Sequence, residues 1–284
     1  MSNAPDLSYC GAQARENDPD RFLTSLFAPV KRREAIWALL AFNQEIAKTR
    51  EVVSETTIGH IRLQWWRDAI VEATAGTPRR HAVVEPLADA VQAYGLPIDK
   101  LSQLIDARET DLEAAPPSDL AALEHYADAT TTPLTSLVIS VLGGDAEQTE
   151  IQDAARSVSV AFALVGQLRA ILFQLGDRHV MLPDDLLQAA DLTAARVADR
   201  PKDERIRPII KQVADCAEGH LTKARRYRSS IPRKLAPAFM IGTLAGLQLK
   251  QMRAAGYDPF DQRMASSHPL QALSLTWRAP FGLW

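Results

Sequence analysis

The stretch SVSVAFALVGQLRAILF, from Ser157 to Phe173, is the longest weakly polar run in the chain. Such a run can form either a buried core helix or a membrane span. Its limited length and the polar side chains of Gln167 and Arg169 favour a helix at the centre of a protein core.

The sequence on either side of this run predicts an all-α protein. Ala, Leu, Arg, Glu and Gln fill long stretches, and the apolar–polar alternation typical of strands is scarce. Asp18-Pro19 has the pattern of a helix start, with an acidic N-cap before a proline at the first helical position. We expect helices at about 18–27, 31–53, 56–75, 86–94, 98–113, 119–142, 149–173, 184–189, 193–199, 204–229 and 233–255.

The breaks between these helices contain Gly and Pro and are too short to be domain linkers. We therefore expect a single-domain helical bundle at 18–268, after an N-terminal segment at 1–17 and before an apolar tail at 269–284. In the tail, Leu270, Leu273 and Trp277 form one apolar helical stripe. This stripe either packs on the bundle or docks on a membrane or a partner.

Composition excludes some functions and favours others. The 284 residues include 46% hydrophobic residues, and the net charge is −3, so nucleic-acid binding has no electrostatic support. Cys10 and Cys216 lie far apart and in no metal spacing, and the histidines show no spacing such as i, i+4. We expect both cysteines to be free thiols in a reducing compartment.

Several charged and aromatic side chains are candidates for a site. Arg169 is either a buried arginine paired with an acid or an anion-binding residue at a cavity. Asp106, Glu109 and Asp111 form either a salt-bridged helix face or a metal site, and Trp65-Trp66 either fills the core or lines a cavity.

Four motifs, in order along the chain, resemble the squalene/phytoene synthase family. The resemblance implies an all-α isoprenoid synthase fold around a deep central cavity. Enzymes of this family join two prenyl diphosphates and hold magnesium with two aspartate-rich motifs. The matching motifs are Ala41-Phe42 with Glu45-Ile46, Gln167-Leu168 with Ile171-Leu172, Val180 to Pro183, and Gly256 to Phe260.

The chain departs from the family at both aspartate-rich motifs. The first has Ala47 and Lys48 at acidic positions and keeps Glu51, and the second has Gln174 and keeps Asp177. Ionising a prenyl diphosphate requires divalent metal held by several carboxylates. We therefore expect no catalytic residue, no metal ligand and no cofactor. The residues that we expect to bind a substrate or ligand are Arg50, Glu51, Arg62, Gln167, Arg169, Gln174 and Asp177.

A more specific resemblance is to the phytoene-synthase-like mitochondrial complex I assembly factor and its α-proteobacterial relatives. It rests on Arg50 to Arg67, above all Ser54 to Gly59, and on Tyr126 to Thr130 and Gly166 to Ala170. It implies a non-catalytic protein that acts in respiratory complex I assembly or binds an isoprenoid or lipid in the cavity. Complex I assembly intermediates are the expected protein partners.

Two enzymatic alternatives stay open. One is an active prenyltransferase that uses magnesium with Glu45, Glu51, Asp177 and Asp111. The other is a metal-free lyase or isomerase with Arg50, Arg62 and Arg169 as anion clamps.

The N-terminus bears on localisation. Met1 to Asn17 has no apolar region and is not rich in arginine, unlike a secretion signal or a mitochondrial presequence. We expect a bacterial, cytoplasmic protein with at most peripheral contact with the inner membrane.

Overall fold

The computed structural model describes residues 7–53, 55–113, 115–176, 180–199 and 203–284. The described residues form helices joined by short turns, and they contain no strand. This confirms the predicted all-α fold. The α-helices are α1 (Tyr9–Asn17), α2 (Pro19–Ser25), α3 (Val30–Ala47), α4 (Thr49–Val52), α5 (Thr56–Thr74), α6 (Val84–Tyr94), α7 (Ile98–Ala107), α8 (Leu120–Val141), α9 (Thr149–Gly176), α10 (Asp184–Ala189), α11 (Ala194–Asp199), α12 (Ile206–Arg226), α13 (Ala236–Phe239), α14 (Ile241–Ala254), α15 (Gln262–Ala265) and α16 (Gln271–Arg278), and the 3-10 helices are η1 (Thr110–Leu112), η2 (Arg228–Ser230), η3 (Arg233–Leu235) and η4 (Ala279–Phe281).

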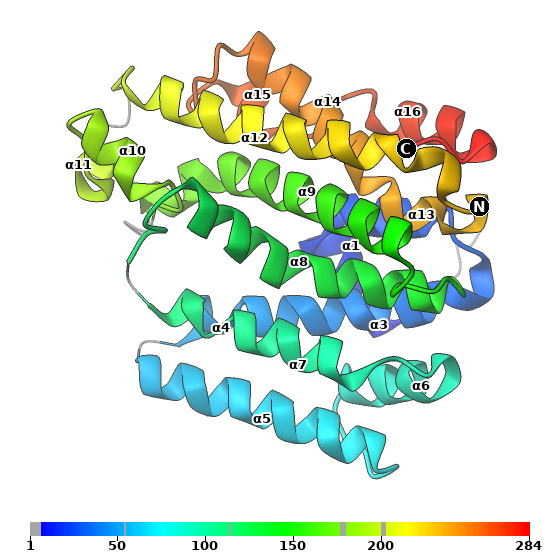
Figure 1. Ribbon diagram of the computed structural model, residues 1–284. Helices are drawn as coiled ribbons and strands as arrows, with labels where there is room; N and C mark the ends of the chain where they lie inside the picture. The colour runs from blue at the N-terminus through cyan, green and yellow to red at the C-terminus, as the bar shows by residue number, and fades with distance from the viewer. Residues whose placement is uncertain (1–6, 54, 114, 177–179, 200–202) are drawn as a thin grey trace, which may run out of the picture.

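The apolar helix α9 lies at the centre of the bundle, packed against α8, α12 and α14 (Figure 1). The part from Thr149 to Ile171 is long and apolar enough to cross a membrane, but 61% of its most apolar window is buried inside the protein. Val158, Leu164, Leu168 and Ile171 are almost fully buried. These contacts are those of the core helix that the sequence predicts.

The remaining helices surround this centre in layers. In Figure 1, α3 lies beside α8, while α5, α6 and α7 cover the lower side and α12, α14 and α16 the upper side. Gly242 of α14 allows a close approach to α9, because a Cβ atom there would lie 2.5 Å from Val158 Cγ2. A glycine at this position therefore lets α14 pack closely on α9.

Local signals explain where several helices begin and end. The Asp18 carboxylate accepts a hydrogen bond from the backbone N–H of Arg21 at 3.0 Å, and Pro19 is the first residue of α2. Gly95 ends α6 with a left-handed φ of 58°. The helix predicted over 31–53 is instead divided at Lys48 into α3 and α4.

Both ends of the described chain, which begins at residue 7, pack on the bundle. The N-terminal segment, for which we predicted no helix, forms α1, and its Cys10 and Ala14 are buried against α3. At the other end, Trp284 is 2% exposed and stacks on Phe239 with ring centroids 4.9 Å apart. The predicted stripe on α16, in contrast, faces outward: Leu273 and Trp277 are 65% and 74% exposed.

Candidate functional site

Glu45 lies on the last turn of α3, one turn before Lys48, and its side chain is 10% exposed. One carboxylate oxygen accepts a hydrogen bond from Lys48 Nζ, and the other accepts one from Arg62 of α5 at 2.7 Å. Two cations of the same chain thus neutralise this buried carboxylate. Arg62, a predicted ligand-binding residue, has its charge paired here.

An apolar groove opens beside this ion-pair cluster. It has a volume of about 550 Å³, and the Glu45–Arg62 pair forms part of its wall. Ile61 is 64% exposed, and Trp65 stands edge-on to the buried Trp66 at 5.0 Å between ring centroids. Trp66 is 1% exposed and fills the core behind the groove wall, to which both tryptophans contribute. The other lining residues are Val52, Val53, Ile58 and His81.

Arg50 and Glu51 on α4 lie in different surroundings. Arg50 Nη1 donates hydrogen bonds to the carbonyl oxygens of Asp111 at 2.8 Å and Glu113 at 3.0 Å, so it holds α4 against the end of η1. Glu51 is exposed.

The carboxylate of Asp111 accepts a hydrogen bond from the Tyr126 hydroxyl at 2.6 Å. Burial raises the pKa of Tyr126, so the hydroxyl stays protonated.

The predicted acidic cluster on α7 and η1 is a set of ion pairs. Arg67 of α5 binds Asp106 at 2.7 Å and Glu109 at 2.6 Å, and Arg108 binds Asp111 at 3.2 Å. These ion pairs favour a salt-bridged helix face over a metal site.

The side chains of Gln167 and Gln174 form an amide chain at the end of α9. Gln167 Oε1 accepts a hydrogen bond from Gln174 Nε2 at 2.7 Å, and Gln174 Oε1 accepts one from the backbone N–H of Met181 at 3.1 Å. A carboxylate at position 174 could not donate to Gln167. Asp177 lies outside the described residues.

Arg169 joins three helices through its charge. It pairs with Asp20 of α2 at 3.0 Å, and the same carboxylate oxygen accepts a hydrogen bond from Gln248 of α14 at 3.1 Å. The Asp20 side chain is 7% exposed and that of Arg169 is 22% exposed. The paired-arginine interpretation is thus confirmed. Apart from the exposed Glu51, the predicted ligand-binding residues that the structure describes fall into separate hydrogen-bonded groups.

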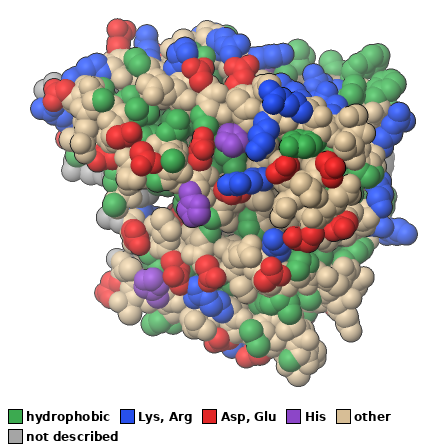
Figure 2. Space-filling view, viewed as in Figure 1, with side chains coloured by type: hydrophobic (Ala, Val, Ile, Leu, Met, Phe, Trp, Pro, Cys, Tyr) green, Lys and Arg blue, Asp and Glu red, His purple; other side chains and the backbone are tan. Residues whose placement is uncertain are grey.

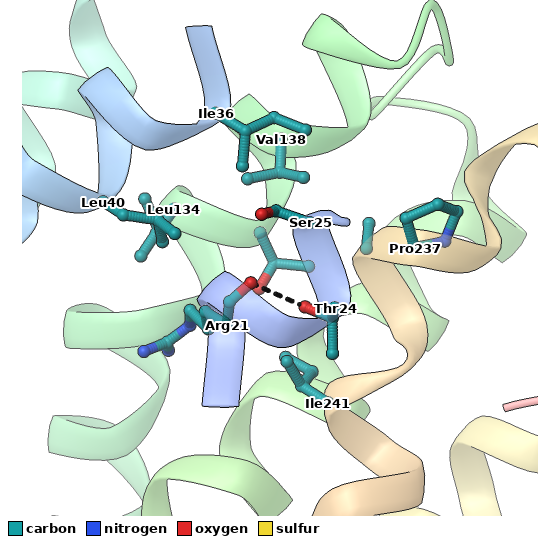
Figure 3. Close-up of a pocket in the computed structure, with 11 residues that line it drawn as sticks. Arg21, Thr24, Ser25, Ile36, Leu40, Leu134, Val138, Pro237 and Ile241 are labelled. Atoms are coloured by element: carbon teal, nitrogen blue, oxygen red, sulfur yellow. Dashed lines mark hydrogen bonds between the residues drawn. The ribbon is translucent and has the colours of Figure 1, made fainter. Parts of the chain in front are cut away.

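A second pocket lies between α2, α3, α8, α13 and α14 (Figure 3). Arg21, Thr24, Ser25 and Thr135 supply its polar groups, and Thr24 donates a hydrogen bond to the Arg21 carbonyl oxygen. Its volume is about 20 Å³. That is room for about one water molecule, so a prenyl chain would fit here only if side chains moved.

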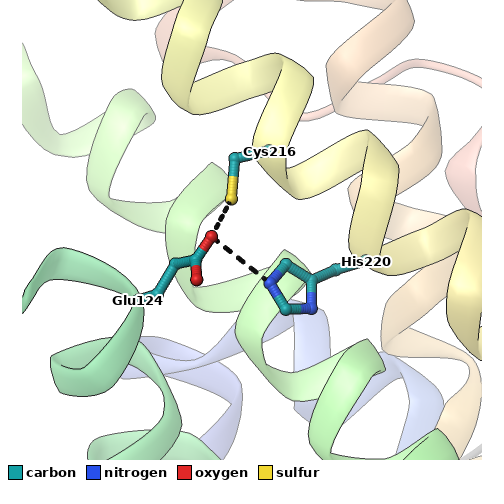
Figure 4. Close-up of side chains that lie close together, drawn as sticks. All are labelled: Glu124, Cys216 and His220. Atoms are coloured by element: carbon teal, nitrogen blue, oxygen red, sulfur yellow. Dashed lines mark hydrogen bonds and ion pairs between the residues drawn. The ribbon is translucent and has the colours of Figure 1, made fainter. Parts of the chain in front are cut away.

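One cluster was missed by the sequence prediction. Glu124 of α8 lies beside Cys216 and His220 of α12 (Figure 4). Among the described residues this is the one group of three Cys, His, Asp or Glu side chains whose ligand atoms all lie within 4.8 Å of one another. The expectation that Cys216 has no metal spacing is wrong, because Cys216 and His220 are spaced i, i+4 on one helix. Both cysteines are free thiols, as predicted.

Comparisons with known proteins agree on one family. The family model for squalene/phytoene synthase matches residues 14–271. NADH dehydrogenase (ubiquinone) complex I, assembly factor 6 from Bos taurus is 31% identical, covering 95% of this chain and 81% of the relative, and its Homo sapiens counterpart is 29% identical over 96% and 82%. A chloroplastic phytoene synthase from Daucus carota is 22% identical over 89% and 65%.

Solved structures show the same fold. A squalene synthase from Alicyclobacillus acidocaldarius superposes with a TM-score of 0.77 at 19% identity, covering 88% of this chain and 94% of that one. A dehydrosqualene synthase gives a TM-score of 0.81 at 14% identity, with 96% and 94% covered. The family match over most of the chain and the shared helical fold lead to one conclusion: this chain belongs to the squalene/phytoene synthase family.

Proposed function

We propose that this protein is a non-catalytic member of its family that takes part in the assembly of respiratory complex I. Support comes from relatives named as complex I assembly factor 6, which align with 95% or more of this chain. Complex I assembly intermediates are its proposed partners.

The proposal that the protein is not catalytic rests on the pairing of Glu45 with Lys48 and Arg62. A magnesium–diphosphate site needs several carboxylates free to face metal ions. Here the buried carboxylate next to the first motif is neutralised within the chain. Lys48 and Gln174, at positions that are acidic in the family's motifs, also carry side chains that cannot bind magnesium as a carboxylate does.

Deleting the gene from its host tests the assembly role. We expect assembled NADH:quinone oxidoreductase to fall on native gels and to return when the wild-type gene is restored, while a second respiratory complex stays constant. Normal amounts of the complex in the deletion strain would contradict the proposal.

An activity assay tests the rival, an active prenyltransferase. Purified protein is incubated with radiolabelled farnesyl or geranylgeranyl diphosphate and Mg²⁺. We expect no condensation product. Product that disappears in Glu51→Gln, with Glu16→Gln on exposed α1 surface as the control, would establish the enzyme instead.

We also infer that an isoprenoid or lipid chain binds this protein, and we favour the groove beside Glu45 as its place. The side chains of Val52, Ile58 and Ile61 are exposed. Covering them with a ligand would contribute about 25 cal/mol of binding free energy for each Å² of apolar surface removed from water. Farnesol binding should weaken in Ile61→Asp and stay unchanged in Val71→Asp, an exposed position on α5 that does not line the groove. Equal binding by both variants would exclude the groove.

We propose peripheral contact with the inner membrane for a cytoplasmic protein, through α16. Leu270, Leu273, Trp277 and Phe281 are each more than half exposed, and Figure 2 shows hydrophobic side chains there beside Lys and Arg. Burial and the nearby charges of Arg225 and Arg278 lower the pKa of Arg228, which marks a local excess of positive charge. Apolar side chains beside cations match an anionic lipid surface.

Vesicle flotation tests this contact. Vesicles of phosphatidylglycerol and phosphatidylcholine should carry wild-type protein, and pure phosphatidylcholine should carry less. We expect Leu273→Ser with Trp277→Ser to stay unbound, whereas Val71→Ser binds like the wild type. Flotation unaffected by the α16 changes would contradict the proposal.

A further inference from the structure

The cluster of Glu124, Cys216 and His220 combines three kinds of metal-binding side chain at one point of the surface. Cys216 and His220 occupy successive turns of α12 and point to the same side, toward Glu124 on α8 (Figure 4). The Cys216 thiol donates a hydrogen bond to Glu124 Oε1, and His220 Nε2 lies 3.6 Å from the same oxygen. None of these residues lines the groove beside Glu45 or the pocket of Figure 3.

The three ligand atoms lie within 4.8 Å of one another, and the distance between His220 and Glu124 fits a small tetrahedral ion. Bonds of about 2.0–2.3 Å to nitrogen, oxygen and sulfur place the ligand atoms of a zinc ion roughly 3.3–3.7 Å apart. The 3.6 Å between His220 Nε2 and Glu124 Oε1 falls in this range. The thiol lies closer to the carboxylate than two zinc ligands do, so binding an ion requires Cys216 Sγ and Glu124 Oε1 to move apart.

The electrostatics of the cluster favour a cation. A divalent ion would stabilise the thiolate and the Glu124 carboxylate together. The two negative charges and one neutral imidazole would balance the charge of the ion.

We propose that Glu124, Cys216 and His220 bind one Zn²⁺ ion, with the fourth position open to water. The Cys216 proton passes to solvent as the zinc–sulfur bond forms, and no electron is transferred. The side chains of His220 and Glu124 are 23% and 37% exposed, so an ion can enter from solvent. A bound ion would link α8 to α12 over the central helix α9. This site goes beyond the proposed function and does not depend on it.

Cobalt substitution tests the site in the full-length protein after chelator treatment. Co²⁺ bound to a thiolate gives a charge-transfer band in the near-ultraviolet, and we expect this band to saturate at one ion per chain and to disappear when Zn²⁺ is added. Cys216→Ser should abolish the band, and His220→Ala and Glu124→Gln should each weaken Zn²⁺ binding more than tenfold.

Matched variants separate this site from other cysteines and histidines. His125→Ala, at the exposed neighbour of Glu124, and Cys10→Ala should keep the band and the affinity of the wild type. Zn²⁺ should also raise the midpoint of thermal unfolding of the wild type but not of Cys216→Ser, and circular dichroism confirms that each variant is folded. A wild type without the band, or a band that survives in Cys216→Ser, would overturn the proposal.

Discussion

At the scale of single residues, Arg169 shows how an apolar helix tolerates a charge. A buried guanidinium without a counter-ion would cost several kcal/mol. Asp20 supplies the negative charge, and Gln248 holds the carboxylate in place. The arginine therefore acts as a connection between α2, α9 and α14, and a role in binding an external anion would require this connection to open.

Replacing Asp20 by alanine should destabilise the protein by about 3 kcal/mol, because it leaves Arg169 partly buried and unpaired. Urea unfolding measures this change in the free energy of unfolding. The control is Asp215→Ala, which removes the exposed pair with Lys211 and should cost less than about 0.5 kcal/mol. Similar losses in the two variants would contradict the structural role of Asp20.

The kind of interaction made by Arg169 could be predicted from sequence, but its partner could not. An arginine inside an apolar run needs an acid, and many acids are available. Asp20 precedes it by 149 positions, and only the packing of α2 against α14 selects it. For the same reason Glu124, 92 positions before Cys216, gave no local signal, whereas the spacing of Cys216 and His220 was visible.

At the scale of helices, strong local signals gave correct predictions. The helix at 184–189 begins after a proline with two aspartates in its first turn and has the predicted bounds, and the helix that starts at Thr56 ends one residue earlier than expected. α1 was missed because it buries small residues, Cys10, Gly11 and Ala14, rather than an apolar stripe. The break at Lys48 was missed because neither Gly nor Pro marks it.

The contact between α14 and α9 gives a prediction at this scale. Gly242→Ala should destabilise the protein by about 1–3 kcal/mol, because the added methyl group overlaps Val158 and overpacks the contact. Gly219→Ala on α12 meets no atom within 4 Å and should instead stabilise the protein by up to about 1 kcal/mol. We expect the two variants to shift the midpoint of thermal unfolding in opposite directions. A Gly242→Ala variant with the midpoint of the wild type would show that α14 can shift.

At the scale of the whole molecule, the last residue is part of the folded core. Trp284→Ala should cost about 3 kcal/mol or more, because its buried ring fills space against Phe239. Trp277→Ala, which removes a ring that is 74% exposed, should change stability by less than about 0.5 kcal/mol. Guanidinium unfolding of both variants measures the difference, and equal stability would mean that the chain end folds apart from the bundle.

The connection between Asp20, Arg169 and Gln248 also bears on how the protein is made. During synthesis Asp20 emerges from the ribosome early. Gln248, which donates a hydrogen bond to the Asp20 carboxylate, follows 228 residues later. Until α14 has left the exit tunnel, α2 has no complete place to dock. We therefore expect this part of the bundle to finish folding only after α14 has been synthesised, with the nascent helices open to chaperones until then.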